Sequence, residues 1–124
     1  MEGALRLKFH YYDSVEFRKF LERLSDDEIS AIISMIGKVE KYGIIYSMKH
    51  QVVKKLESNL FEIRIHLFHG ISRSIYFKSV DGCYVISNSF IKKSRKTPQS
   101  ELKKARHRRR KYNDRNREPY QRPQ

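Results

Sequence analysis

The stretch LFEIRIHLFHGISRSIYFK, Leu60–Lys78, decides the fold of this chain. Between Phe61 and Leu67, apolar residues alternate with charged residues or histidine, which is the period-2 pattern of a half-buried strand. His69-Gly70 is a turn signal, and alternation resumes from Ile71 to Phe77. Two strands joined by so short a turn predict an antiparallel hairpin.

Strand signals also flank this hairpin on both sides. Asp81-Gly82 is a strong turn signal, and Tyr84–Ile91 follows it as a last strand. Nearer the N-terminus, Leu5–Tyr11 alternates in the same way, and Val52-Val53 indicates a short strand or strand entry. We therefore expect an antiparallel sheet of about four strands.

Two consecutive helices are predicted between the first strand and the hairpin. Asp13 or Ser14 can cap the first, which runs to about Leu24. Ser25–Glu28 has the form of a capping box, and an apolar stripe follows until Gly43 stops the second helix. The chain is predicted to be an α+β protein whose helix pair packs on one sheet face and leaves the other partly open.

A basic helix is predicted to close the domain. Thr97 and Pro98 suit its start, and it spans about Gln99–Tyr112 with few apolar residues. Residues 113–124 are polar and rich in charge, which favours a flexible basic tail. The expected organisation is one domain over residues 1–112 followed by this tail.

The charge of the chain is concentrated at its C-terminal end. The whole sequence has 27 basic and 14 acidic residues, but Lys92–Gln124 alone holds 14 basic and 3 acidic ones. Such a field favours a polyanionic partner, with RNA or DNA as the first candidate. The alternative is a solvated helix face that serves solubility.

Several other classes of protein are disfavoured by the composition. Cys83 is the one cysteine, so no internal disulfide is possible, and its place in a predicted strand favours an inert thiol. The five histidines lack metal-ligand spacing, and no glycine-rich phosphate loop occurs. No apolar run near the N-terminus suits a signal or a membrane helix. We expect a cytoplasmic protein without metal, cofactor or membrane contact.

Arg73 is the most anomalous residue. It shares a strand face with Ile71, Ile75 and Phe77, and a cation among inward apolar positions needs a partner or a ligand. Two interpretations stay open: a structural salt bridge, for example with Glu62 on the neighbouring strand, or an arginine that binds phosphate on an open sheet surface.

Other cations accompany Arg73 along the strands. Arg64 has the opposite parity to the apolar residues of its strand, while Lys54-Lys55 precedes that strand and Lys92-Lys93 ends the last one. Each alone is typical of an exposed side chain. Together they place several cations around one sheet surface.

These segments also carry a family resemblance. KKLESNLFEIRIHLFHGISRSIYF, residues 54–77, and SNSFIKKSRKTPQSELKKARHRRRKY, residues 87–112, resemble RelE-like toxins, in particular the phage-derived Gp49-like or HigB-like branch. The matching positions are Lys55, Leu56, Glu57, Leu60, Glu62, Arg64, Arg73, Tyr76, Phe90, Lys92, Lys93, Lys96, Thr97, Pro98 and Ala105. Ile63 departs from the usual Leu, and Phe61 stands where Trp is frequent.

The resemblance implies the toxin of a type II toxin–antitoxin system, with the RelE-like fold of small microbial ribonucleases. Such a toxin cuts mRNA on the ribosome through the RNA's own 2′-OH, without a cofactor. Its partner would be a cognate helix-turn-helix antitoxin, and operator DNA would be bound only indirectly through that complex. A non-cleaving RelE/ParE-type toxin and a basic nucleic-acid-binding protein are the alternatives.

Site residues follow from the same resemblance. Arg73 and Lys93 would stabilise the phosphate, with Arg64 as a third cation and Lys54 or Lys55 as proton acceptor or RNA clamp. The general acid is left open among Tyr76, His66 and Tyr112. Further RNA contacts are expected from Lys92, Arg95, Lys96, Lys103, Lys104 and Arg108. Arg73→Ala is expected to abolish toxicity and keep the fold.

Overall fold

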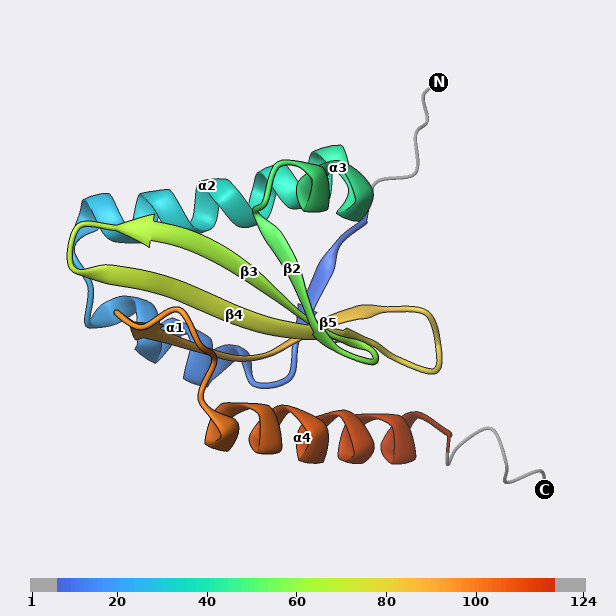
Figure 1. Ribbon diagram of the computed structural model, residues 1–124. Helices are drawn as coiled ribbons and strands as arrows, with labels where there is room; N and C mark the ends of the chain where they lie inside the picture. Colours follow the sequence, from blue (N-terminus) through green and yellow to red (C-terminus); the bar gives the residue numbers. More distant parts are fainter. Residues whose placement is uncertain (1–6, 118–124) are drawn as a thin grey trace.

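The computed structural model describes residues 7–117 (Figure 1). In chain order its elements are β1 (Phe9–Tyr11), α1 (Ser14–Glu22), α2 (Asp26–Tyr42), α3 (Ile44–Lys49), β2 (Val53–Glu57), β3 (Leu60–Leu67), β4 (Gly70–Lys78), β5 (Tyr84–Lys92) and α4 (Gln99–Arg117). The α+β class is as expected. The beginning of the first predicted strand, residues 5 and 6, lies outside the described residues.

The sheet has the strand order β1-β5-β4-β3-β2. The predicted hairpin is confirmed, with β3 and β4 antiparallel, and β2 and β5 also pair antiparallel with their neighbours. The expectation of about four antiparallel strands is wrong: the sheet has five strands, and the predicted first strand, β1, runs parallel to β5 with Phe9 opposite Tyr84. A strand of three residues pairs with a segment far along the chain, and local periodicity carries no signal for that pairing.

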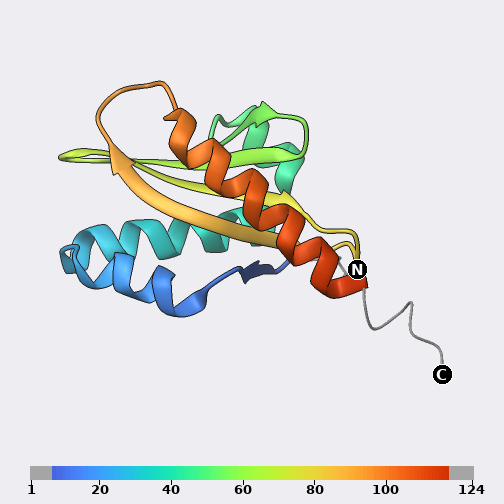
Figure 2. The same cartoon turned by 90° about the horizontal axis from the view of Figure 1, so that it is seen from below.

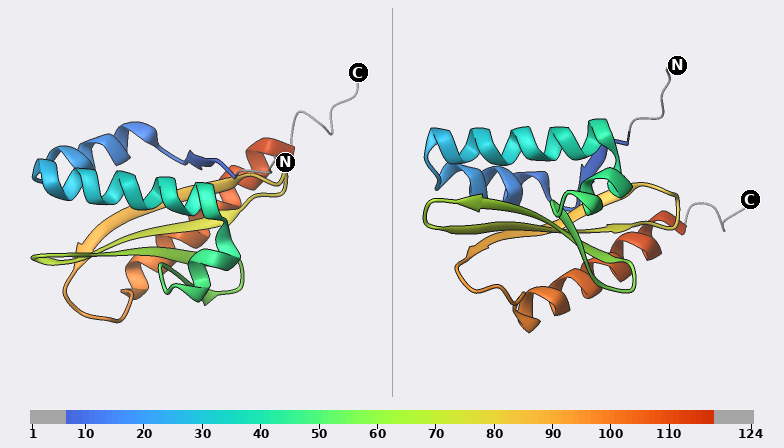
Figure 3. Two further views of the ribbon diagram at one scale, coloured as in Figure 1. Left: turned by 90° about the horizontal axis from the view of Figure 1, so that it is seen from above. Right: turned by 45° about the horizontal axis from the view of Figure 1, so that its top comes forward.

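Helices α1 and α2 cover one face of the sheet, as predicted (Figure 3). Buried apolar residues from both layers form one cluster there, with Ile32 and Ile36 of α2 against Ile63 and Ile65 of β3. Tyr76 of β4 is fully buried in this cluster. We call this surface the helix-pair face.

The opposite face is not left open in the way the sequence suggested, because α4 crosses it (Figure 2). Leu102 and Ala105 of α4 are buried against Ile75, Phe77 and other residues of the sheet. The predicted narrow apolar edge of the helix is therefore sufficient for packing. We call this surface the α4 face.

Local end signals of the helices are confirmed, but two boundaries are not. The Ser25–Glu28 capping box forms in full, and Gly43 ends α2 with a φ of 92°. The short helix α3 directly after Gly43 was not predicted. Helix α4 continues through residues 113–117, where the sequence predicted a flexible tail, and residues 118–124 lie outside the described part.

Arginines of α4 hold the helix to the rest of the molecule. Arg106 forms two hydrogen bonds of 2.7 Å with Glu57 of β2. Arg108 donates to Glu16 of α1 at 2.7 and 2.9 Å and to the carbonyl of Ser87 at 2.6 Å. Bidentate arginine–carboxylate geometry makes these pairs stronger than typical surface pairs. Part of the basic run therefore has a structural use.

The Glu16–Arg108 pair predicts a pH-dependent anchorage of α4. The hydrogen bond from Arg108 holds the pKa of Glu16 below its ordinary value of 4.5. A lowered carboxyl pKa stabilises the fold above that ordinary value, and the contribution is lost as the pH falls through the lowered pKa. Because Glu16 is partly exposed, we expect Glu16→Gln to reduce the unfolding free energy at pH 7 by only about 1 kcal/mol.

Urea unfolding at pH 7 and at pH 3 measures this effect, and the difference from wild type should shrink at the lower pH. Glu22→Gln is the matched control, because Glu22 faces Arg18 at 3.9 Å with both side chains well exposed. Equal losses in the two variants would contradict a special role for the Glu16–Arg108 pair.

Candidate functional site

Two arginines lie directly opposite each other on the α4 face of the sheet. Arg64 of β3 pairs with Arg73 of β4, and Arg73 in turn pairs with Phe90 of β5. Side chains at such paired positions lie about 5 Å apart at Cβ, and like charges there repel. The two guanidinium groups therefore need a nearby counter-charge.

Glu62 supplies that counter-charge from the same face of β3. Arg64 Nε donates to Glu62 Oε1 at 3.0 Å, and Arg73 Nε lies 3.9 Å from Glu62 Oε2. Thr97 adds a hydroxyl hydrogen bond of 2.8 Å to the same carboxylate. Glu62 and Arg73 are both fully buried, and a buried carboxylate is tolerated only when it is paired in this way. The salt bridge with Glu62, which was one of the two interpretations of Arg73, is therefore present.

The loop between β5 and α4, residues 93–98, covers these arginines. Arg73 Nη2 donates to the carbonyl oxygen of Ser94, and Arg64 Nη2 donates to that of Arg95 at 3.0 Å. The side chains of residues 93–96 are exposed, so the loop turns its carbonyl groups inward and its cations outward. Figure 1 shows the loop in orange, between the end of β5 and α4.

Arg73 keeps unused donors beneath this loop. Within the described part of the chain, its Nε and Nη1 atoms have no hydrogen-bond partner. Burial lowers the pKa of Arg73, which Glu62 opposes and Arg64 reinforces. An arginine so placed still carries its charge, and this charge is only partly satisfied.

The open end of the same face lies towards the β3–β4 turn. His66, Ile71 and Lys92 are aligned across three strands, two residues along from the arginine pair. A hollow of about 330 Å³ opens here, lined by His66, Leu67, Phe68, His69, Gly70, Ile71 and Lys93. An imidazole and an ammonium group thus border one exposed hollow beside Arg64.

The other predicted cations are distributed more widely. Lys54 and Lys55 are exposed on the edge strand β2, but only Lys54 shares the face of Glu62, since Lys55 is paired with Phe61. Lys103 and Lys104 are exposed on α4. Arg108, expected to bind RNA, is already bound to Glu16 and Ser87.

The residues left open as general acids are separated by the fold. Tyr76 is buried on the helix-pair face, and burial, with Tyr84 adding to it, raises the pKa of its hydroxyl. Tyr112 packs edge-on against Phe77, and burial also raises its pKa. We call the α4-face positions Glu62, Arg64, His66, Arg73 and Lys92 the arginine surface. Of the three candidate acids, His66 alone lies on the exposed part of this surface.

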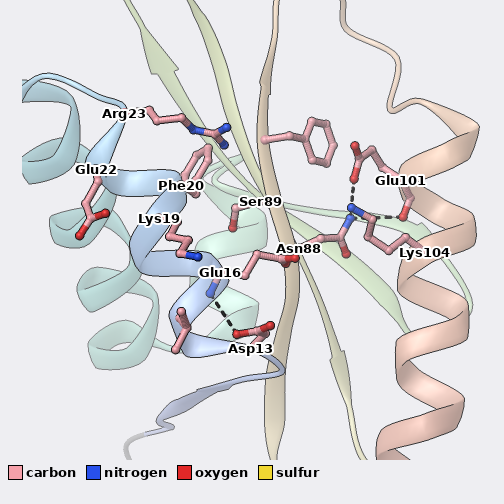
Figure 4. A pocket seen from close by; sticks show the side chains of 12 residues that line it. Asp13, Glu16, Lys19, Phe20, Glu22, Arg23, Asn88, Ser89, Glu101 and Lys104 are labelled. Carbon is pink, nitrogen blue, oxygen red and sulfur yellow. Dashed lines mark hydrogen bonds between the residues drawn. The ribbon is translucent and has the colours of Figure 1, made fainter.

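A larger groove of about 900 Å³ lies between α1, β5 and α4 (Figure 4). Its charged lining is mixed: Asp13, Glu16, Glu22, Glu101, Lys19, Arg23 and Lys104. Asn88 donates to Glu101 at 2.8 Å within it. Four carboxylates against three cations do not suit a polyanion, so size alone does not identify the site.

A family model matches most of the chain. The model of the family described as "Phage derived protein Gp49-like (DUF891)" matches residues 19–110. The chain belongs to this Gp49-like family. The family is phage-derived and toxin-like, which is consistent with the toxin of a toxin–antitoxin pair and suggests an antitoxin partner. No curated protein matches the chain.

The Gp49-like match includes every residue of the arginine surface and its covering loop, while β1 and the last turns of α4 fall outside it. Among residues 7–117 of this Gp49-like protein, no group of three His, Cys, Asp or Glu residues could hold a metal ion. No helix in the same part is long and apolar enough to cross a membrane.

Cys83 is half-buried, and burial, with Asp81 adding to it, raises its thiol pKa.

The sequence reading missed the link between Thr97 and Glu62. Thr97 was expected only as a helix cap, yet its side chain is buried and joins the covering loop to the carboxylate. The sequence carried no signal for this link, because Glu62 shares the parity of Arg64, opposite to the apolar residues of its strand, and Thr97 lies 35 residues away along the chain.

Loss of the Thr97 hydroxyl should loosen the covering loop of this Gp49-like protein. We expect Thr97→Val to lower the unfolding free energy by about 2 kcal/mol, because a buried carboxylate loses a donor. Amide hydrogen exchange of residues 94–96 should accelerate at the same time. Thr97→Ser, which keeps the hydroxyl, is the control, and identical exchange in both variants would refute the link.

Proposed function

We propose that this protein is the toxin of a type II toxin–antitoxin pair and cleaves mRNA on the ribosome until a cognate helix-turn-helix antitoxin neutralises it. Family membership supports the toxin class. The observation that carries the proposal is the paired Arg64 and Arg73, with the exposed His66, Lys92 and Lys93 beside them.

The proposed reaction uses the RNA's own 2′-OH as nucleophile. Its oxygen attacks the adjacent phosphorus, the bond from phosphorus to the 5′-oxygen breaks, and a 2′,3′-cyclic phosphate and a 5′-hydroxyl result. One proton leaves the 2′-OH and one reaches the departing oxygen, so an acid and a base are needed. Cations must stabilise the additional negative charge on the crowded phosphate.

Lys93 and Arg64 are proposed to bind the scissile phosphate. Lys93 is exposed on the hollow, and Arg64 lies two residues before His66, which also lines the hollow, with its guanidinium fixed by Glu62. Arg73 is proposed to donate further hydrogen bonds to the phosphate, although the covering loop at Ser94 lies over it. Its unpaired Nε and Nη1 atoms become available once the covering loop shifts. Arg73→Ala would therefore also destabilise the fold, and it is a poor test of catalysis alone.

His66 is proposed as a proton-transfer group. It lies two residues from Arg64 on the same face and borders the hollow with Lys93. Histidine exchanges protons near neutral pH without special surroundings. Lys54 shares this face and is proposed as an RNA clamp, whereas Lys55 points to the other face of the edge strand.

The remaining exposed cations are proposed to hold ribosomal RNA by charge. Arg95 and Lys96 extend the arginine surface along the covering loop, and Lys103 and Lys104 continue it onto α4. Such contacts give affinity that falls as salt rises. Arg108 is better assigned to anchoring α4, because Glu16 already binds its guanidinium.

The burial of Arg73 favours one second function. A toxin of this fold could bind its target through the exposed lysines and block it without cleavage, leaving Arg73 as a purely structural cation. The decisive experiment is to induce the protein in cells and map mRNA 5′ ends with and without the neighbouring gene. Growth arrest without new frame-phased ends would select the non-cleaving function.

Removal of the Lys93 charge should abolish most cleavage. We expect Lys93→Gln to lower the cleavage rate about a hundredfold, as loss of one charge-stabilising donor typically does. Because Lys93 is exposed, the thermal unfolding of the Lys93→Gln protein should match that of wild type. Lys19→Gln, an equal charge change at an exposed position of α1, is the control. Wild-type cleavage by Lys93→Gln would remove Lys93 from the reaction.

Cleavage should require a 2′-OH at one position of the substrate, the nucleotide on the 5′ side of the cleaved bond. A ribosome-bound message with a 2′-deoxy nucleotide on the 5′ side of the cleaved bond should resist cleavage completely, because the nucleophile is missing. Primer extension on purified ribosomal complexes detects this. Cleavage of the deoxy-substituted message would rule out 2′-OH attack.

A further inference from the structure

A second hollow, of about 310 Å³, lies between the end of α2 and α3 on the helix-pair side of the molecule. Tyr42, Tyr46 and His50 line it together with apolar residues such as Val39 and Val52. The three rings form a column, with centroids 5.0 Å apart between the two tyrosines and 4.2 Å apart between Tyr46 and His50.

The two tyrosine rings of this column are more exposed than aromatic side chains of a core. Aromatic residues at helical spacing usually belong to a core, but Tyr42 and Tyr46 are 50% and 47% exposed and lie outside both core clusters. Ring faces that remain in contact with water are available to a planar ligand.

The charges around the column are positive. Lys38 lines the hollow, Lys41 Nζ lies 5.4 Å from the centre of the Tyr42 ring, and Lys49 is exposed on α3. The Glu40 carboxylate does not line the hollow and instead accepts a 2.8 Å hydrogen bond from the amide of Phe9. A ligand suited to this hollow is planar and apolar at its centre and negatively charged at its edge.

A backbone contact at the edge of the sheet links the hollow to the proposed cleavage surface. The carbonyl of Val52, which lines the hollow, accepts a 2.8 Å hydrogen bond from the amide of Arg64. Strand β2 then runs along this edge (Figure 3). Lys54 and Lys55 are exposed on its two faces. A chain of phosphates crossing β2 would meet a cation on each side.

We propose that this hollow binds an unpaired nucleobase of single-stranded RNA, stacked against the Tyr42–Tyr46–His50 column, with the flanking phosphates held by Lys38 and Lys41. Rings interleaved with cations are the chemistry that binds single strands without sequence preference. The identity of the ligand as RNA rests on the proposed function. The apolar residues that a protein helix would seek, Ile45 and Met48, are exposed on α3 but do not line the hollow.

The test measures the binding of a labelled RNA hexamer by fluorescence anisotropy. The hexamer carries 2′-O-methyl groups, so it has no free 2′-OH and cannot be cleaved by 2′-OH attack. A matched hexamer with abasic residues keeps the phosphates and removes the bases. We expect Tyr46→Ala to weaken binding of the base-bearing hexamer about tenfold and to leave the abasic hexamer unchanged. Tyr46→Phe should bind like wild type, and so should Ile45→Ala, the matched control on the same helix.

Equal weakening for both hexamers, or no weakening for either, would overturn the proposal. Unchanged RNA binding by Tyr46→Ala together with lost binding of the antitoxin would do the same and assign the hollow to a protein contact. Base-dependent binding in a protein that never cleaves RNA would support the hollow while rejecting the proposed catalysis. The two proposals therefore fail separately.

Discussion

The Glu62 carboxylate is the group on which the α4 face depends. It is fully buried, and it is the counter-charge shared by two arginines that the strand register places directly opposite each other. Without it, Arg64 and Arg73 would repel across the β3–β4 pair, and the ladder would carry an uncompensated charge in its interior. Thr97 extends the same network to the covering loop, so one carboxylate fixes two strands and the start of α4.

Between residues 103 and 109 of α4, arginines and lysines make different contacts. Arg106, Arg108 and Arg109 of α4 bind carboxylates or carbonyl oxygens of the body of the molecule, whereas Lys103 and Lys104 on the same helix are exposed. The planar guanidinium suits several fixed acceptors at once, and the ammonium group does not. A strongly basic helix can therefore pack against the sheet and still present positive charge to an RNA.

The covering loop gives the proposed site its particular form. It uses inward carbonyl oxygens to hold Arg64 and Arg73 and turns its own side chains outward. The exposed part of the surface is thus the hollow with His66 and Lys93. The buried part contains Arg73, whose Nε and Nη1 atoms have no hydrogen-bond partner among the described residues. On the other side of the edge strand, the ring column at α2 and α3 forms a second surface. Its centre is aromatic and its margin carries positive charge, whereas the arginine surface is charged at its centre.

Local chemistry determined much of this molecule from the sequence alone: the hairpin of β3 and β4, the capping box at Ser25, the stop at Gly43 and the positive C-terminal third. These depend on neighbours within a few residues, so the chain reports them directly. Only the tertiary structure decided that Arg73 lies beneath a loop, that β1 runs parallel to β5 and that Arg108 meets Glu16. Each of these joins segments distant in sequence, and strand register and helix placement, which periodicity does not encode, select the partner.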